Sequence, residues 1–295
     1  MNARTTCQRP LDALWPDLQA AGADGDVVHT TAVGHAAQLA RKAVADGVSR
    51  LVIVGGDGTG FEVLNGLFPV ADGSLPEVAY LPLGTGNSFV RDLHIDDTEA
   101  AVRALAQGRA EPVDVLHARC SAADAHSNEA SDFYSINLIS TGFTADVGDV
   151  VNRRFKRLGA AGYAAGVLAR LATLKSPILP IQLDDATVVR HPITLLSLSN
   201  SRYTGGSMEM APDARIDDGL MDVIRVGRMG RFRLITAFPR IYAGTHTRMA
   251  AIETHTARAV TFPDAAPRDW MVDGEVLHRT VESVAVLPGA LRVVR

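Results

Sequence analysis

Residues 50–60 carry the sequence Arg-Leu-Val-Ile-Val-Gly-Gly-Asp-Gly-Thr-Gly, and their pattern indicates the fold class of the first part of the chain. The apolar run 50–54 is rich in β-branched residues and predicts a strand buried on both faces, as in a parallel sheet. Glycines follow the run directly, and residues 61–68 have the pattern of a short helix. Glycine lets the backbone approach a ligand closely, and a helix N-terminus offers free N–H groups to phosphate. The stretch therefore predicts a strand, a ligand-binding loop and a helix.

The flanking segments repeat this alternation of strand and helix. Apolar segments at 26–30 and 78–82 predict strands, while 35–46 and 97–107 have the spacing of amphipathic helices. Strands that alternate with helices are typical of βαβ units and a parallel sheet. We expect a Rossmann-like α/β domain over residues 1–114.

The pattern changes after residue 114, where strand-like segments follow one another. The expected strands are 113–119, 132–139, 178–183, 193–199, 221–227, 250–256, 258–262 and 281–287. The expected helices are 146–157, 159–174 and 231–241. Runs of strands with few helices predict a second, largely antiparallel domain over 115–295. The last few residues are candidates to return to the first domain.

Composition excludes several classes of protein. The 295 residues include 29 basic and 33 acidic side chains, and the net charge of −4 argues against a general nucleic-acid binder. Cys7 and Cys120 lie far apart without metal-ligand spacing, which excludes a disulfide scaffold and a zinc site built on cysteine pairs. The first twenty residues lack the apolar stretch of a signal peptide, and the longest apolar stretch, 158–169, is too short to span a bilayer. We expect a cytoplasmic protein.

Asp57 places a carboxylate in the first glycine loop, at the carboxyl end of a predicted parallel strand. Open α/β sheets bind ligands at this end. A carboxylate beside phosphate is unfavourable unless a cation lies between them, so the loop indicates a nucleotide with Mg²⁺. The alternative is a tight strand-to-helix turn without a ligand.

Residues 82–87, Pro-Leu-Gly-Thr-Gly-Asn, form a second glycine loop after the next predicted strand. Two such loops on successive strands of one sheet are expected to flank a single crevice. The spacing does not match the dinucleotide motif Gly-x-Gly-x-x-Gly, and no lysine follows a glycine run as in a Walker A loop. The motifs His-Glu-x-x-His and Gly-x-Ser-x-Gly are absent as well.

Two turns in the second half carry carboxylates. Residues 211–220, Ala-Pro-Asp-Ala-Arg-Ile-Asp-Asp-Gly-Leu, combine acidic side chains with backbone carbonyls, which are the oxygen ligands of hard cations. Residues 273–275, Asp-Gly-Glu, lie between two strand-like runs. Taken alone, the first is more typical of a solvated turn than of a cation site, and the second is typical of a β-hairpin.

All four segments, in this order, resemble the diacylglycerol kinase catalytic domain family of lipid kinases, which includes bacterial diacylglycerol kinases, YegS-like lipid kinases and sphingosine kinases. The resemblance runs from about residue 30 to the C-terminus. It also includes Glu-Val-Leu-Asn-Gly at 62–66, Asn137 with Thr-Gly-Phe at 141–143, and Tyr-Thr-Gly-Gly at 203–206. One glycine loop would be weak support because NAD kinases and phosphofructokinases carry similar loops. The ordered set is specific because those families do not share the later segments.

The resemblance implies an α/β nucleotide domain, a C-terminal β-sandwich domain and an active site in the cleft between them, with ATP and Mg²⁺ as cofactors. Asp57 would place Mg²⁺-ATP, and Glu275 would be the base that takes the proton from the lipid hydroxyl. A structural Mg²⁺ would be held by Asp218 and by the backbone carbonyls of Arg215 and Leu220. The implied nucleotide contacts, with the two glycine loops included, are Thr30, Gly55, Gly56, Asp57, Gly58, Thr59, Gly60, Phe61, Glu62, Gly84, Thr85, Gly86 and Asn87.

The expected activity is phosphoryl transfer to a lipid hydroxyl, with diacylglycerol or a related glycerolipid as acceptor. The expected partner is a lipid at the membrane surface, and a homodimer is left open. The basic run 153–157 is a candidate membrane contact or a solvated helix face. Two other functions stay open: an NAD kinase-like enzyme, based on residues 55–59 alone, and a catalytically weak lipid- or nucleotide-binding relative.

The chain departs from the family pattern at two places. Bacterial members commonly begin with a strand that ends in Asn-Pro-x-x-Gly, and residues 1–30 contain no match. Two explanations stay open: the start of the sequence is assigned too far downstream, or one strand of the first sheet and one wall of the ATP site are missing. Ser88 stands where bacterial members commonly have aspartate, although sphingosine kinases tolerate a small residue there.

Overall fold

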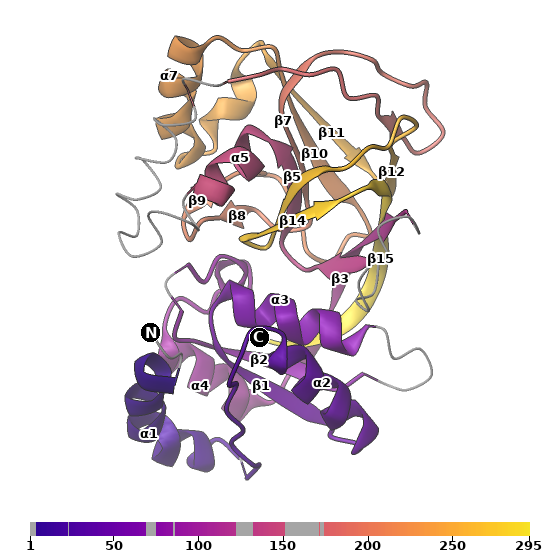
Figure 1. The fold of residues 1–295 in the computed structure, drawn as a ribbon. Coiled ribbons are helices and arrows are strands. Elements are labelled where there is room, and N and C mark those ends of the chain that lie inside the picture. The colour runs from indigo at the N-terminus through magenta and orange to yellow at the C-terminus, as the bar shows by residue number, and fades with distance from the viewer. Residues whose placement is uncertain are drawn as a thin grey trace. The chain divides into compact units, whose positions relative to one another are not determined.

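The structure is a computed structural model that describes residues 4–22, 24–68, 75–84, 86–121, 132–150, 171 and 174–295 (Figure 1). It divides into two compact units. The first comprises Met1–Val113 and Gly289–Arg295, and the second comprises Asp114–Pro288. The described helices include none that is long and apolar enough to cross a membrane.

The first unit combines parallel strands with helices. Its elements are α1 (Arg4–Ala20), α2 (His35–Ala45), β1 (Arg50–Gly55), α3 (Asp57–Leu67), β2 (Glu77–Pro82), η1 (Phe89–Arg91) and α4 (Thr98–Gln107). β1 pairs with β2 in parallel, from Arg50 opposite Glu77 to Gly55 opposite Pro82. The final part of β15 (Val281–Val294) adds a further parallel partner, with Val293 opposite Val78. The parallel sheet predicted for the N-terminal part is confirmed.

Local sequence explains where the helices begin and how closely they pack. The Asp97 side chain accepts a hydrogen bond of 2.7 Å from the Ala100 N–H and so caps the N-terminus of α4. Gly108 ends the same helix in the left-handed conformation. α2 and α3 lie side by side (Figure 1). Their backbones are so close at Gly66 that a Cβ there would come within 2.3 Å of the Ala37 carbonyl oxygen. Only glycine permits this approach.

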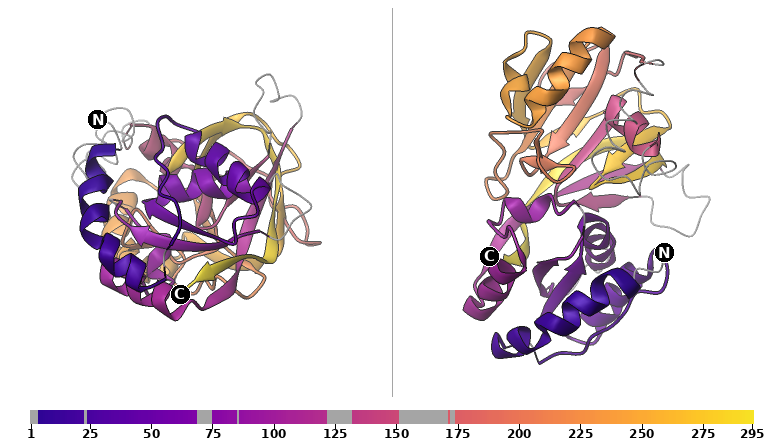
Figure 2. Two further views of the ribbon diagram at one scale, coloured as in Figure 1. Left: turned by 90° about the horizontal axis from the view of Figure 1, so that it is seen from below. Right: turned by 90° about the vertical axis from the view of Figure 1, so that its left-hand side faces the viewer.

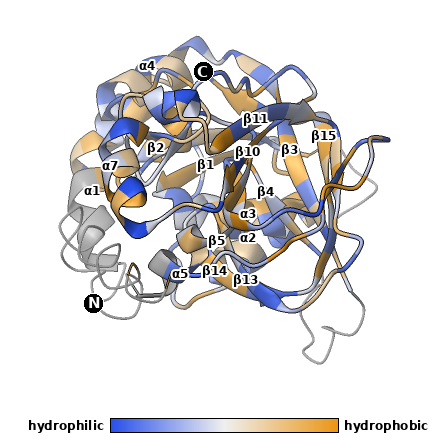
Figure 3. Cartoon of the chain, turned by 90° about the horizontal axis from the view of Figure 1, so that it is seen from above, coloured by the Kyte–Doolittle hydropathy of each residue, from blue (hydrophilic) through white to orange (hydrophobic). Residues whose placement is uncertain are grey.

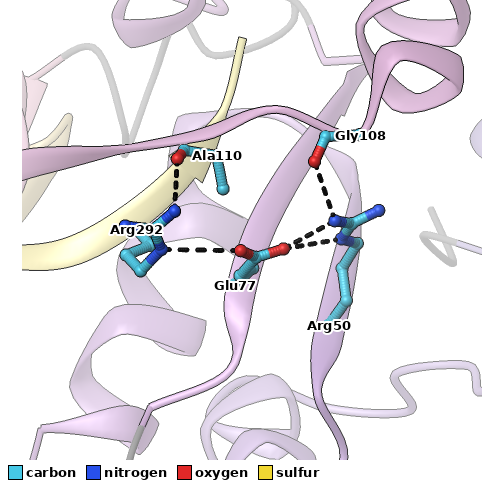
Figure 4. A network of polar contacts seen from close by, with 5 residues as sticks. All are labelled: Arg50, Glu77, Gly108, Ala110 and Arg292. Carbon is cyan, nitrogen blue, oxygen red and sulfur yellow. Dashed lines mark hydrogen bonds and ion pairs between the residues drawn. The ribbon is translucent and has the colours of Figure 1, made fainter.

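A network of polar contacts holds the end of the chain in the first unit (Figure 4). Glu77 accepts hydrogen bonds from Arg50 Nη2 at 2.6 Å and Arg292 Nε at 3.5 Å. The same two arginines donate to the carbonyls of Gly108 and Ala110. The Arg50 guanidinium, followed by that of Arg292, lowers the pKa of Glu77 below its ordinary value. Arg292, near the C-terminus, is therefore ionically linked to the first strands of the same unit.

The expected strand at 26–30 is wrong, because these residues form no strand in the structure. β1 lies at the end of its sheet and, within the described residues, pairs only with β2. A cavity of about 540 Å³ lies between the segment and β1, and both line it. β1 is consequently not buried on both faces as predicted: Val52 remains 37% exposed. The apolar pattern was present, but a strand also needs a hydrogen-bonded neighbour.

The second unit is a β-sandwich, and its described helices include α5 and α7. Among its described residues one sheet has the order β11-β10-β7-β5-β13-β14. The strands of that sheet are β5 (Leu138–Gly142), β7 (Ile193–Ser199), β10 (Met221–Gly227), β11 (Ile252–Ala257), β13 (Arg268–Val272) and β14 (Glu275–Arg279). The other elements are β3 (Ala110–Cys120), β4 (Phe133–Ser135), α5 (Phe143–Val150), β6 (Gln182–Leu183), β8 (Tyr203–Thr204), β9 (Met208–Glu209), α7 (Arg231–Ile241), η5 (Thr245–Arg248) and β12 (Ala259–Thr261). The predicted antiparallel arrangement is confirmed, as every pairing in the order given runs antiparallel.

Figure 2 shows the strands of this unit from two further directions, and side chains of β13 and of the segment after β12 meet in its interior. The ring of Trp270, on β13, contacts the ring of Phe262, which follows β12, at a centroid distance of 5.2 Å. The indole Nε1–H donates to the Arg279 carbonyl at 3.2 Å. Trp270 is thus a core residue with its polar atom satisfied, as expected of a buried tryptophan.

One predicted strand is divided in two. The segment 132–139 forms β4 and β5, separated by a bend at Ile136 and Asn137. The N–H groups of these two residues donate to the Asp273 carboxylate instead of to a neighbouring strand. The patterns also did not predict α1. The helix expected at 159–174 falls almost wholly outside the described residues, and the basic run 153–157 lies outside them entirely.

Candidate active site

The two glycine loops touch each other in the structure. β1 and β2 are parallel neighbours, so their carboxyl ends lie together at Gly55 and Pro82. The Gly84 N–H donates to the Gly55 carbonyl at 3.2 Å. A Cβ built on Gly84 would lie 2.3 Å from the Gly56 Cα, well inside the distance that real Cβ atoms adopt. The crossing therefore requires glycine at Gly84.

Asp57 links the two loops. It is the first residue of α3, and both of its carboxylate oxygens accept from the Ser88 N–H, at 2.9 and 3.0 Å. Burial raises the pKa of this carboxyl above its ordinary value, while hydrogen bonds from Ser88 and the Phe89 N–H oppose the rise. Asp57 therefore holds the second loop against the first, in addition to any role toward a ligand.

Asn87 shapes the second loop from within. Its backbone has a φ of 47°, in the left-handed region where asparagine is tolerated best after glycine. Its side-chain amide donates to the carbonyls of Gly84 at 2.8 Å and Pro82 at 3.3 Å. A Cβ at Gly86 would lie 3.0 Å from the Asp57 carboxylate, so this glycine also packs tightly. Thr85 lies outside the described residues.

Some of the predicted nucleotide-binding residues line the cavity beside β1. Its glycine end is formed by the loops, and the rest runs along the apolar side chains of β1 and the segment before α2. Backbone at the first turn of a helix and an adjoining apolar surface suit a ligand with an anionic end and a flat apolar end. The predicted residues that line the cavity are Thr30, Gly55, Gly56, Thr59 and Gly84.

Other predicted nucleotide residues have structural contacts of their own. The two carboxylate oxygens of Glu62 accept from the N–H groups of Gly34 at 2.9 Å and Ala36 at 3.1 Å, at the start of α2. Gly60 lies against the Tyr80 ring, where a Cβ would come within 3.1 Å of a ring carbon. Gly58 and Phe61 belong to the first turns of α3 and are half-buried. Glu62 thus caps a helix that borders the cavity.

Glu275 follows a turn that is fixed by its neighbour. Asp273 and Gly274 form the two-residue connection between β13 and β14, with φ values of 48° and 93°. Two positive φ values in an Asp-Gly pair are typical of a type I′ hairpin turn. Glu275 is the first residue of β14, pairs with Val272, and is half-buried. Its side chain therefore starts from a well-defined point on the backbone.

Asp273 anchors this turn to the bend between β4 and β5. Its carboxylate is buried and accepts from Ser135 Oγ at 2.6 Å and from the Leu138 N–H at 3.0 Å. The N–H groups of Ile136 and Asn137 donate to the same carboxylate, each at 3.1 Å. The sequence pattern marked the Asp-Gly-Glu turn but could not reveal this role, because the partners lie more than 130 positions earlier in the chain.

The predicted metal ligands lie in an acidic turn. The Asp218 carboxylate accepts from the Leu220 N–H at 3.0 Å, and Arg215 forms a 3.5 Å ion pair with Asp217. Burial, followed by the charges of Asp218 and Asp213, raises the pKa of Asp222 to about 6. The sequence analysis did not single out Asp222.

The acidic turn offers oxygen atoms, which are the ligands that hard cations prefer. A divalent ion would lower the repulsion between neighbouring carboxylates. Asp218 and the carbonyls of Arg215 and Leu220 would supply its oxygen ligands. Within the described residues, however, no three His, Cys, Asp or Glu side chains are grouped closely enough to hold a metal ion by themselves. Backbone carbonyls and water would have to complete the shell.

Each half of the chain matches a model of a known protein family. Residues 3–118 match the model of the diacylglycerol kinase catalytic domain. Residues 137–295 match the model of the YegS C-terminal NAD kinase beta sandwich-like domain. The two matches fall in the same order as the two units of the structure.

Whole-chain relatives agree with these models. A YegS-like lipid kinase of Shewanella frigidimarina is 31% identical over 86% of this chain and 78% of its own length. A diacylglycerol kinase of Mycobacterium tuberculosis is 28% identical over 88% of this chain and 81% of its own length. The crystal structure of a diacylglycerol kinase from Bacillus anthracis shares the fold with a TM-score of 0.68 at 22% identity, over 97% of this chain and 90% of that one.

Proposed function

The chain belongs to the family of diacylglycerol kinases and YegS-like lipid kinases, and from this premise we propose that it transfers the γ-phosphoryl group of ATP to a hydroxyl of diacylglycerol or a related glycerolipid. In this reaction the lipid oxygen forms a bond to the γ-phosphorus, and the bond from that phosphorus to the bridging oxygen breaks. ADP leaves, and the hydroxyl proton passes to a base.

The observation that carries the proposal is the contact between the two glycine loops beside a cavity of about 540 Å³. Loops that approach as closely as Gly56 and Gly84 leave backbone, not side chains, facing a ligand. Phosphoryl transfer depends mostly on positioning and charge stabilisation, and backbone N–H groups serve both. We assign the triphosphate to the glycine end of the cavity and the purine ring to its apolar length along β1.

Asp57 and the acidic turn are the proposed points of contact with Mg²⁺. When bound with ATP, the ion neutralises charge on the phosphates. The Asp57 carboxylate, held in place by Ser88, would orient the ion and its waters from the end of β1. The Asp218 turn would hold a second, structural ion.

Glu275 is the proposed general base. A carboxylate can accept the proton of the attacking hydroxyl as the new bond to phosphorus forms. The type I′ turn and the Asp273 anchor fix the backbone from which Glu275 projects. A fixed base costs the reaction less reorganisation than one on a mobile loop.

The decisive experiment replaces Glu275 by glutamine, which keeps the size of the side chain but removes its basicity. Because a positioned general base typically contributes about 10²–10⁴-fold to rate, turnover of diacylglycerol should fall by that factor. ATP affinity and melting temperature should stay near the parental values. Glu282→Gln, at an exposed position on β15, is the matched control and should keep full turnover.

Four outcomes would redirect the assignment. Full turnover by Glu275→Gln would remove the proposed base. Loss of ATP binding in that variant would place Glu275 in the nucleotide site. Phosphorylation of NAD but of no lipid by the parental protein would favour the NAD kinase-like alternative, whereas ATP binding without any transfer would favour a binding protein.

A further inference from the structure

The segment before α2 forms one wall of the cavity beside β1, yet few interactions hold it there. Residues 26–30 pair with no strand, and the side chains of Val27, Val28 and Val33 are 44%, 64% and 97% exposed. Among the described residues, the hydrogen bonds of 26–33 reach no further along the chain than His35. A segment with so little burial and no strand partner opens easily unless another contact holds it.

Glu62 on α3 supplies such a contact. Its Oε1 accepts a hydrogen bond of 2.9 Å from the Gly34 N–H, and its Oε2 accepts one of 3.1 Å from the Ala36 N–H. Gly34 is the N-cap residue of α2 and has no side chain that could cap the helix. Because a carboxylate at a helix N-terminus satisfies free N–H groups and is favoured by the helix dipole, Glu62 serves as the cap that α2 lacks.

This contact joins two walls of the cavity. The α2 wall consists of residues 27–30 and Ala36, whereas Thr59 and Val63 line the cavity from α3. Figure 3 shows the hydrophobic residues of β1, which line the same cavity. Ala36 is both a lining residue and a partner of Glu62, so the Glu62 side chain fixes the start of α2 relative to α3.

Glu62 also lies on the face of α3 where the two helices pack together. Gly66 follows it by four positions, which places both residues on one side of the helix. The backbones of α2 and α3 are closest at Gly66, and Glu62 adds a polar contact one turn earlier. Among the described residues that line the cavity, Thr59 and Val63 are included but Glu62 is not. Its carboxylate therefore faces the α2 backbone.

We propose that Glu62 is a positioning residue for ATP, which holds the α2 wall at the separation from α3 that the nucleotide needs and does not bind the nucleotide itself. The inference rests on the proposed function, because that function places ATP in this cavity. Without the contact, the α2 wall would spend part of its time displaced. The apparent dissociation constant of a ligand that binds only the closed arrangement rises as the closed fraction falls.

The experiment measures ATP binding to the full chain by isothermal titration in the presence of Mg²⁺. Glu62→Ala should raise the dissociation constant about tenfold, which corresponds to a closed fraction of about a tenth. Glu62→Gln keeps one oxygen that can accept from an N–H group and should lose less. With diacylglycerol as acceptor, the loss should appear in KM for ATP and not in kcat. Glu99→Ala, which removes an exposed ion pair with Arg103 on α4, is the matched control and should bind ATP as the parent does.

Nucleotide analogues distinguish positioning from direct contact. The groups of ATP that can donate a hydrogen bond to a carboxylate are the two ribose hydroxyls and the adenine amino group. 2′-Deoxy-ATP, 3′-deoxy-ATP and inosine triphosphate each lack one of them. Glu62→Ala should weaken binding of ATP and of all three analogues by the same factor. If ATP loses affinity but one analogue does not, Glu62 contacts the missing group and the proposal is overturned. Parental ATP affinity in Glu62→Ala would overturn it as well.

Amide hydrogen exchange in the protein without nucleotide tests the contact itself. The amides of Gly34 and Ala36 should exchange faster in Glu62→Ala than in the parent, and equal rates would contradict the role of Glu62. Partial unfolding of Glu62→Ala would lower the binding stoichiometry without raising the dissociation constant, and Glu62→Gln then decides the question. If the parent and variants bind ATP as described but the parent phosphorylates no lipid, the proposed function fails and the positioning role stands.

Discussion

The backbone N–H of Ser88 donates to both carboxylate oxygens of Asp57 and thereby joins the loop after β1 to the loop after β2. The Ser88 side chain also hydrogen-bonds this carboxylate and opposes the rise that burial causes in its pKa. From the family resemblance an aspartate is expected at this position. In this chain a second carboxylate would face the first at close range, and serine avoids that repulsion.

Asp57→Asn should separate the structural from the chemical role of this residue. Asparagine keeps an oxygen to accept from the Ser88 N–H, so the melting temperature should stay within a few degrees of the parental value. Transfer to lipid should fall at least about a hundredfold, because charge-orienting groups in active sites contribute on this scale. Circular dichroism melting and a radiolabelled ATP assay measure the two effects. A variant with parental turnover would show that Asp57 serves only as the link between loops.

Gly84→Ala should weaken ATP binding and the stability of the first unit together. The new Cβ would lie 2.3 Å from the Gly56 Cα, so backbone must shift, and overpacking of this kind typically costs about 1–3 kcal/mol. Gly25→Ala is the control, since a Cβ there meets nothing within 4 Å. Isothermal titration with ATP and thermal melting would follow both quantities. Unchanged ATP affinity in Gly84→Ala would place the nucleotide away from this crossing.

Asp273→Ala should destabilise the second unit by about 3 kcal/mol or more, because it leaves three buried N–H groups and a serine hydroxyl without their acceptor. Asp273→Asn, which keeps one carbonyl oxygen, should lose less. Urea unfolding measures both free energies. Asp269→Asn changes the partner of an exposed histidine on the same hairpin and should be nearly neutral. A loss for Asp273→Ala no larger than this control would contradict the anchor.

Asp218→Ala should abolish a Mg²⁺-dependent rise in melting temperature. A ligand at one hundred times its dissociation constant stabilises the folded state by about 2.7 kcal/mol, or roughly 5–10 °C for a protein of this size. Asp264→Ala, in an exposed ion pair with Arg190, should keep the full response to the ion. If Mg²⁺ raises the melting temperature of parent and Asp218→Ala equally, the structural ion is not held by this turn.

His246 should make the stability of the second unit sensitive to mild acid. Burial lowers the pKa of this histidine below its ordinary value of 6.5. Between that folded-state pKa and 6.5 the unfolded chain binds more protons, so stability is complete above pH 6.5 and decreases as the pH falls below it. His246→Gln should flatten the decrease measured by urea unfolding between pH 7.5 and 5. The exposed His191→Gln should leave the parental profile in place, and an identical profile in His246→Gln would locate the titrating group elsewhere.

Much of the fold could be predicted from hydrophobic periodicity, but the edge of the first β-sheet could not. The spacing in α2, α4 and α7 and the apolar runs of β1 and β2 were sufficient to predict these elements. The same kind of run at 26–30 failed, because periodicity reports which face of a segment is apolar and not whether a neighbour exists for it to pair with. Val52 is exposed for the same reason.

Features of the candidate site that depend on residues adjacent in the chain could be predicted from the sequence. Features that depend on contacts between residues far apart in the chain could not. Glycine spacing was sufficient to indicate that the two loops meet. The anchoring role of Asp273 depends on Ser135 and the bend behind it, and the raised pKa of Asp222 depends on burial together with Asp213 and Asp218. Contacts between residues so far apart in the chain form only when the chain folds. The proposed roles of Glu275 and of the metal turn came from family resemblance and stay predictions.

The return of residues 289–295 to the first unit sets an order of events during synthesis. Val293 pairs with Val78 on β2, and Arg292 completes the ion pairs of Glu77, so these contacts span 215 positions. A ribosome adds about 5–20 residues per second, so the first unit waits about ten seconds or more for its last strand. During this interval β2 exposes an unpaired edge in the nascent chain. Folding of the first unit is thus coupled to completion of the second, and a chaperone that shields strand edges would act chiefly in that window.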